Sequence, residues 1–340
     1  MEWQSVSLGS TRPSTLQPSR TMTILLLVGM TCTVSQAQTD DAQVATKLDA
    51  TVSEWMQQDQ VKAASLAVMH DGRIVKTSDY GGMDAGKPAP IASLSKAITG
   101  VCIARLIDEG HLSFSTPLGA VLSGAFRKFK QPADARFQSV TIEQLLMHRG
   151  GLVRELPPGN PEPRELDDMF RKVLAIPLEA DPGVKMSYSN IGYRILGKIV
   201  EVISKKSYEP YCRENVLTPM SASGSIERRG IGPSGGWRIS AIDYAKFMEV
   251  FDPKSSLLGK ESRAWLDTRH EVPTYGLGMF IRRTGNGVLY LHSGKDLRGG
   301  GAYSIKFGNG WTTVVLFDGY HNDDVYGDLR RRLESAVSKL

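Results

Sequence analysis

Apolar residues are spaced in two different ways along the chain, and the spacing changes with position. Towards both ends they form short runs or alternate with polar residues, which is typical of β-strands. The predicted strands are residues 65–69, 73–76, 276–282, 288–292, 300–307 and 311–317. The first two flank His70-Asp71-Gly72, where Asp71-Gly72 can supply the positive φ angles of a hairpin turn.

Elsewhere apolar residues recur every three or four positions, which predicts amphipathic helices. The predicted helices are residues 42–58, 93–108, 141–148, 164–174, 190–204, 208–216 and 242–251, with a final helix through Val325, Leu329, Leu333 and Val337. This order predicts a discontinuous α/β domain of residues 43–92 and 232–340, with a mainly helical domain, residues 93–231, inserted into it. A cleft where the two meet is the expected site.

The first 37 residues have the features of an export signal. Arg12 and Arg20 precede an apolar run at residues 23–30, and the small residues of Ser35-Gln36-Ala37 follow it. The run is about half the ~20 residues that a membrane-spanning helix needs. We therefore expect a secreted or periplasmic protein with no stable membrane insertion after cleavage. An organelle transit peptide and an uncleaved N-terminal anchor are the alternatives.

Composition restricts the function further. The chain has 340 residues, of which 41% are hydrophobic and 23% charged, an ordinary globular balance. The net charge of +5 is spread along the sequence, which argues against a nucleic-acid partner. After cleavage only Cys102 and Cys212 remain; both lie in apolar helical runs, where free buried thiols are the commoner outcome, with a disulfide as the alternative. No His or Cys pair has the spacing of zinc ligands.

The strongest chemical signal is Ser93-Leu94-Ser95-Lys96, where an extended Pro-containing segment gives way to a helix. Residues i and i+3 share a helix face, so Lys96 can reach the Ser93 hydroxyl. A lysine with a lowered pKa can then take the serine proton and create a nucleophile. A capping serine followed by a solvent-exposed lysine is the alternative.

Two later segments carry further candidates. Tyr188-Ser189-Asn190 begins a helix, so a phenol and an amide could both face a cleft. His292-Ser293-Gly294 ends an alternating run, and the glycine allows a close backbone approach. Taken singly, the first segment also fits a packed Tyr followed by an Asn that caps the helix. The second also fits an ordinary core or surface histidine.

Two other motifs match a pattern without its context. Residues 81–87 fit the spacing of a phosphate-binding loop, but Pro88 follows where Ser or Thr is needed. Gly232-Pro233-Ser234-Gly235-Gly236 fits G-x-S-x-G, but no strand leads into it, so we interpret it as a Gly-rich loop.

Taken together, the three segments with Ser93, Tyr188 and His292 resemble the motifs of the serine β-lactamase and penicillin-binding-protein superfamily. The closest match is the branch with class C β-lactamases, DD-carboxypeptidases, D-aminopeptidases and β-lactamase-like esterases. The resemblance covers roughly residues 44–340. It implies an α+β, β-lactamase/transpeptidase-like fold: an antiparallel sheet flanked by helices, with an inserted all-helical domain.

The resemblance also implies a hydrolase that acts through an acyl-enzyme on an ester, a D-amino-acid amide or peptide, or a β-lactam. Ser93, Lys96 and Tyr188 are then catalytic, and Asn190 orients Lys96 and the substrate. His292, Ser293 and Gly294 bind the substrate, with His292 also able to tune Tyr188. The backbone N–H groups of Ser93 and Lys295 form the oxyanion hole. No metal or organic cofactor is implied.

Departures from the family pattern leave the substrate open. Class C enzymes have Lys-Thr-Gly as the third motif, and His292 replaces that permanent cation, which weakens the case for binding a β-lactam carboxylate. Arg149 and Gly150 follow His148, where Thr and Ser are more usual. A true class C-like β-lactamase and a catalytically silent binding or scaffold protein are the alternative functions.

Overall fold

The computed structural model describes residues 22–268, 274–285, 287–319 and 321–337. Its helices are α1 (Met22–Gln58), α2 (Ser95–Asp108), α3 (Leu118–Lys128), α4 (Ile142–Leu146), α5 (Leu166–Val173), α6 (Asn190–Ser204), α7 (Tyr208–Cys212), α8 (Ala241–Met248), α9 (Lys260–Asp267) and α10 (Asp323–Val337). The residues from Val44 onward form one compact unit, which begins within α1.

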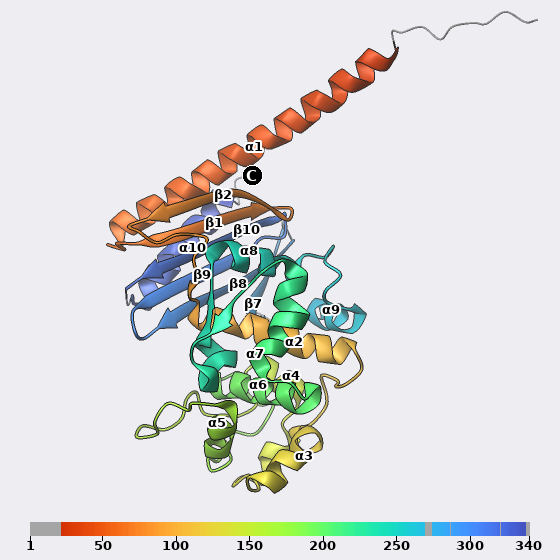
Figure 1. Ribbon diagram of the computed structural model, residues 1–340, viewed down its shortest axis with the longest axis vertical. Coiled ribbons are helices and arrows are strands. Elements are labelled where there is room, and N and C mark those ends of the chain that lie inside the picture. The colour runs from red at the N-terminus through yellow and green to blue at the C-terminus, as the bar shows by residue number, and fades with distance from the viewer. Residues whose placement is uncertain (1–21, 269–273, 286, 320, 338–340) are drawn as a thin grey trace, which may run out of the picture. The chain divides into compact units, whose positions relative to one another are not determined.

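The strands belong to two sheets, as far as the chain is described. The main sheet holds β1 (Ala64–His70), β2 (Arg73–Tyr80), β6 (Thr274–Gly276), β7 (Met279–Thr284), β8 (Gly287–Asp296), β9 (Gly300–Lys306) and β10 (Trp311–Asp318), in the order β2-β1-β10-β9-β8-β7-β6. All of its pairings are antiparallel. Strands from both ends of the chain therefore meet at the β1–β10 pair (Figure 1).

The main sheet is covered on both faces, because its central strands alternate between two apolar cores. In β1, Leu66 and Val68 pack with α10 and the part of α1 after Val44, whereas Ala67 and Met69 join the core that includes α2 and α8. The helices α2 to α7 form the block seen below the sheet in Figure 1. The predicted order of strands, helical block and strands is thus present, while the exact domain boundaries stay a prediction.

Some elements escaped the sequence prediction. The helices α3 and α9 were not expected, nor was a small sheet of β3 (Ala89–Pro90), β5 (Trp237–Ile239) and β4 (Ser225–Ile226). Strands of two or three residues are too short to show a period-two pattern. This small sheet has a clear role, because β3 leads directly into the Ser93 segment.

The two cysteines also differ from expectation. Cys102 on α2 and Cys212 at the end of α7 form a disulfide, with Cα atoms 5.7 Å apart, instead of two free thiols. The apolar runs correctly predicted burial, since both residues are fully buried. Pairing required the packing of α7 against α2, which a one-dimensional pattern does not contain.

The predicted export signal lies largely outside the described residues: nothing is described before Met22, and residues 22–37 belong to α1. Within the parts of the chain that are described, no helix combines the length and the apolar character needed to cross a membrane. Export therefore stays a prediction.

Candidate active site

Ser93 lies in a single 3-10 turn, Ala92–Leu94, directly before α2. The backbone N–H of Ile91 donates to the carbonyl of Trp237 (3.1 Å), which ties the start of this turn to β5. Ala92 has a φ of 45°, in the left-handed region that a residue with a Cβ seldom adopts. The surrounding structure therefore holds the backbone next to Ser93 in a strained conformation, as is common at functional sites.

Lys96 is fully buried one helical turn after Ser93. Its Nζ lies 3.1 Å from Ser93 Oγ and donates to the carbonyl of Ser234 at 2.7 Å. Burial lowers the pKa of Lys96 well below its ordinary value, and the positive charge of Arg194 lowers it further. Both effects favour the neutral amine, which is the form that can accept a proton from Ser93.

Tyr188 completes the predicted catalytic trio. Its ring centroid lies 4.8 Å from Lys96 Nζ. Burial raises the pKa of Tyr188, and a hydrogen bond with Ser93 opposes this rise. The structure therefore brings Ser93, Lys96 and Tyr188 together, with an amine suited to accept a proton and a phenol suited to donate one.

The segment that carries Tyr188 is anchored by His148 and by Arg149, which follows it at a position where Thr is more usual in the family. Nδ1 of His148 accepts a hydrogen bond from the backbone N–H of Ser189 (3.1 Å), and its ring lies against that of Tyr188, with centroids 4.3 Å apart. The Arg149 guanidinium donates to the carbonyl of Gly183. The arginine at this unusual position thus fixes the loop that carries Tyr188.

Asn190 lies in the wall of the cleft with its amide held by Glu155, not by Lys96, and its predicted contact with the substrate stays a prediction. Its Nδ2 donates to Glu155, and its Oδ1 is buried with no hydrogen-bond partner among the described residues. Its amide donor is therefore engaged by a carboxylate, while the carbonyl of Ser234 holds Lys96. Ser234 lies in the predicted Gly-rich loop, and its residue type does not reveal this role, because the contact is made by its backbone carbonyl.

His292 is predicted to bind the substrate or to tune Tyr188, and both roles stay predictions. Its ring is 3% exposed, and both nitrogens are engaged: Nδ1 donates to the carbonyl of Ser293 (2.6 Å), so Nε2 accepts from the Tyr275 hydroxyl (3.0 Å). Burial lowers the pKa of His292 to about 3, and the nearby Lys96 adds to this effect. His292 is therefore a neutral, buried residue; Ser293 beside it on β8 is half-buried.

The lowered pKa of His292 predicts a dependence of stability on pH. In the unfolded chain this histidine takes up a proton near pH 6.5, but in the folded protein its pKa is about 3. Its contribution to stability is therefore fully present above pH 6.5 and is lost as the pH falls from 6.5 towards 3. Between pH 7 and pH 5 the histidine should account for a loss of about 2 kcal/mol in the free energy of unfolding. Urea unfolding of wild type and His292→Gln at both pH values should show a smaller loss in the variant. Equal losses would refute the assignment.

Gly294 brings β8 against the nucleophile turn. A Cβ added there would lie 2.3 Å from the carbonyl oxygen of Ile91 and 3.2 Å from the backbone nitrogen of Ser93. The pairing of β7 with β8 ends at Leu291, so residues 292–294 of β8 extend beyond the end of β7. This proximity supports the predicted oxyanion hole of the Ser93 and Lys295 N–H groups, which stays a prediction.

The Gly294→Ala variant should separate the two segments. The added methyl group has backbone on one side and cannot be accommodated by a side-chain rotation, so we expect acylation of Ser93 to slow by about 10²-fold through displaced oxyanion donors. Gly285→Ala is the control, because nothing lies within 4 Å of its added Cβ and its φ is not positive. Acylation at the wild-type rate in Gly294→Ala would contradict the close approach.

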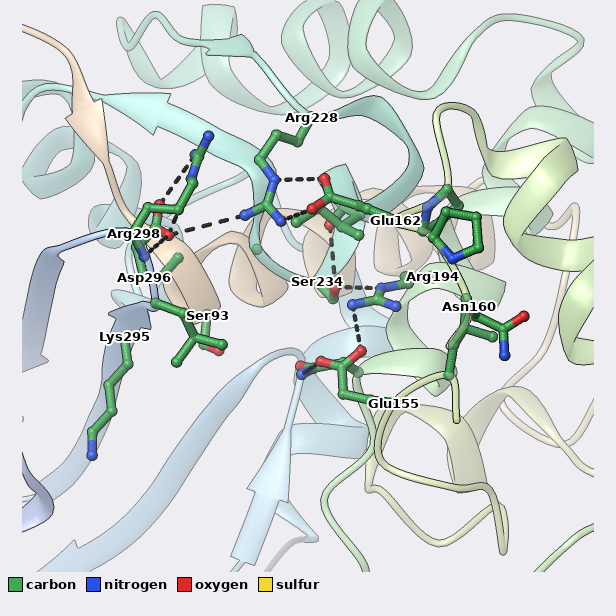
Figure 2. Close-up of a pocket in the computed structure, with 18 residues that line it drawn as sticks. Ser93, Glu155, Asn160, Glu162, Arg194, Arg228, Ser234, Lys295, Asp296 and Arg298 are labelled. Atoms are coloured by element: carbon green, nitrogen blue, oxygen red, sulfur yellow. Dashed lines mark hydrogen bonds and ion pairs between the residues drawn. The ribbon is translucent and has the colours of Figure 1, made fainter. Parts of the chain in front are cut away.

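Ser93 opens onto a cleft of about 330 Å³ (Figure 2). Its walls carry ion pairs: Arg194 with Glu155 (2.7 Å), and Arg228 with Glu162 and, at 4.0 Å, with Asp296. Arg228 thus links Glu162, in the segment between α4 and α5, to Asp296 at the end of β8. Among the residues that the structure describes, no group of three or more His, Cys, Asp or Glu side chains could hold a metal ion.

Comparison with known proteins identifies the family. Residues 48–337 match the family model described as Beta-lactamase. The chain belongs to the beta-lactamase family. Members of this family are serine hydrolases, so the match confirms the resemblance inferred from the three motifs. A beta-lactamase/D-alanine carboxypeptidase from Pseudomonas syringae has a TM-score of 0.72 with the chain at 15% identity, covering 87% of this chain and 99% of that one, and confirms the fold.

Proteins related to this chain in sequence carry different functional names. Protein flp of Staphylococcus aureus (strain MW2) is 28% identical over 193 residues, which are 54% of this chain and 38% of that protein. An N-acetylmuramyl-L-alanine amidase of Bacillus subtilis (strain 168) is 29% identical over 209 residues, 53% of this chain and 46% of that protein. The matched segments span less than half the length of these relatives.

Proposed function

We propose that this beta-lactamase family member is an exported serine hydrolase that forms an acyl-enzyme on Ser93. The observation that carries the proposal is the position of Lys96 Nζ, fully buried and 3.1 Å from Ser93 Oγ. A buried lysine with a lowered pKa beside a serine hydroxyl is suited to nucleophilic catalysis.

In the acylation step, Lys96 takes the hydroxyl proton as Ser93 Oγ bonds to the substrate carbonyl carbon. The carbonyl oxygen becomes an oxyanion held by backbone N–H groups. The intermediate then collapses, the bond to the leaving group breaks, and Tyr188 donates a proton to that group. Lys96 serves as the resting base, because its pKa is lowered whereas that of Tyr188 is raised. Lys96 then returns its proton to Tyr188, which restores both groups. Water attacks the acyl carbon as Lys96 takes its proton, the bond between Ser93 Oγ and the acyl carbon breaks, and that proton passes to Ser93 Oγ while the acid product leaves.

The substrate is an ester, a D-amino-acid amide or peptide, or a β-lactam. We favour an ester or amide over a β-lactam, because His292 is buried and uncharged where a cation would bind the β-lactam carboxylate. Export is supported by the N-terminal sequence and by the disulfide between Cys102 and Cys212, since disulfides persist in oxidising compartments.

Mass spectrometry after incubation with a fluorophosphonate tests the proposal. We expect one adduct, on the peptide that contains Ser93, and none in Ser93→Ala. A panel of p-nitrophenyl butyrate, a D-alanyl dipeptide and nitrocefin then ranks the activities. The absence of both an adduct and turnover would favour a silent scaffold, and dominant nitrocefin turnover would favour a β-lactamase.

A further inference from the structure

Arg194 is a buried cation in the wall of the cleft, close enough to the candidate base Lys96 to interact with its charge. It lies on α6, one turn after Asn190, and is only 5% exposed. Burying a guanidinium is unfavourable unless its charge and its N–H groups find partners. Two partners are present: one terminal nitrogen lies 2.7 Å from Glu155 Oε2, and Nε donates to Ser234 Oγ at 3.0 Å (Figure 2).

The partner Ser234 connects Arg194 to the candidate base. Its hydroxyl accepts from Arg194 and donates to the carbonyl of Ile231 (3.1 Å), while its own carbonyl accepts from Lys96 Nζ. A single residue therefore has its side chain held by Arg194 and its backbone bound to Lys96. Moving the arginine would move the carbonyl that orients the amine.

The turn that carries Ser234 needs such an anchor. Gly232–Gly236 holds three glycines in five residues, and glycine has the greatest backbone freedom of any residue. The hydroxyl of Thr99 on α2 donates to the carbonyl of Pro233 (2.6 Å), which fixes the side of the turn next to the nucleophile helix. Arg194 fixes the other side from α6.

We propose that Arg194 is a positioning residue of the reaction, which holds the Gly232–Gly236 turn so that the Ser234 carbonyl keeps Lys96 against Ser93. The proposal rests on the proposed function, because it assumes that Ser93 is acylated. It assigns Arg194 no contact with the substrate.

The arginine also acts on Lys96 through charge. Among the described groups around the amine, Arg194 on α6 and Arg154 disfavour the ammonium form, and Glu155 favours it. The rings of Tyr188 and Tyr193 line its surroundings, and burial lowers the pKa of both His148 and His292, which keeps these two rings neutral. The Arg194–Glu155 pair therefore places two opposite charges near one base.

Opposite shifts in the pH profile of Ser93 acylation test this arrangement. Arg194→Gln removes the positive charge and leaves Glu155 unpaired, so Lys96 should be protonated more readily. The acidic limb of the profile, where the acylation rate falls as Lys96 takes up a proton, should therefore move to higher pH. Glu155→Gln keeps the shape and removes the negative charge, so the limb should move to lower pH. A purely structural pair would give no such opposition.

Rates separate positioning from charge. Ser234→Ala keeps the charge of Arg194 but removes the hydroxyl through which Arg194 holds the Gly232–Gly236 turn. Acylation should therefore slow by about tenfold or more, with the acidic limb of the pH profile in its wild-type position. Arg194→Gln should show a similar or larger loss together with the shifted limb. Arg194→Lys should restore the limb but not the full rate, because an ammonium cannot span both partners as a planar fork does.

The matched control is Arg213→Gln, an exposed arginine paired with Glu209 at 3.8 Å, which should leave rate and limb unchanged. Circular dichroism melts show which variants fold; if Arg194→Gln does not, Glu155→Gln and Ser234→Ala decide. Absence of wild-type acylation overturns the proposed function and this inference with it. Wild-type acylation combined with unchanged rates and limbs in the folded variants overturns the role of Arg194 alone.

Discussion

Replacing Lys96 with methionine should slow acylation of Ser93 by roughly 10³- to 10⁴-fold, the upper range for loss of a positioned general base. Lys96 is the group placed 3.1 Å from the hydroxyl with a lowered pKa, and Tyr188, whose pKa is raised, is a poor substitute. The rate of fluorophosphonate labelling, compared with wild type and with Ser93→Ala as the blank, measures the effect.

The same substitution should leave the fold intact or stabilise it. Methionine is close to lysine in length and carries no desolvation penalty for a buried amine, which offsets the loss of the hydrogen bond to the Ser234 carbonyl. Lys198→Met is the matched control on α6: Lys198 pairs with Glu201 at 3.0 Å, so this variant should lose stability and retain acylation. Labelling of Lys96→Met within tenfold of wild type would show that another group acts as the base.

Reduction of the disulfide between Cys102 and Cys212 should lower the free energy of unfolding by about 5 kcal/mol, from the entropy of a loop of this size. The bridge closes a segment with a sequence separation of 110 residues, which includes the Tyr188 loop and α6. Guanidinium unfolding with and without a thiol reductant measures the loss without creating a cavity. Cys102→Ala with Cys212→Ala should lose at least as much stability as the reduced protein, because both truncated side chains are fully buried and leave a cavity as well.

Thiol titration of the oxidised, denatured protein provides the check on this result. Cys102 and Cys212 should be unreactive until reductant is added. Two reactive thiols, together with equal unfolding midpoints under both conditions, would mean that the cysteines are unpaired in the protein as it is made.

Local patterns predicted most elements of the fold. The strands of the main sheet and helices such as α2 and α6 bury one side or both, and burial leaves a period of two or of about 3.6 in the sequence. Elements without a period long enough to detect, such as β3, β4 and β5, were missed. The pairing of Cys102 with Cys212 was missed for another reason, because it depends on the packing of two helices far apart in the chain.

The site was predictable in its chemistry and less so in its contacts. Ser93, Lys96 and Tyr188 come together as their motifs implied. Asn190 and His292 occupy the expected segments but are engaged by Glu155 and by Tyr275. Each unexpected partner lies at least 17 residues away in the sequence, and Ser234 lies 138 residues from the lysine it binds.

By itself, the sequence determined which residues carry reactive groups and which family the chain resembles, because these depend on residue type and on spacing within one helix or strand. The protonation and the contacts of those groups depend on the three-dimensional packing. Burial and the charge of Arg194 favour the neutral form of Lys96, and packing leaves His292 buried and neutral. Both effects arise because desolvation and Coulomb interactions depend on distance in space, whatever the separation along the chain.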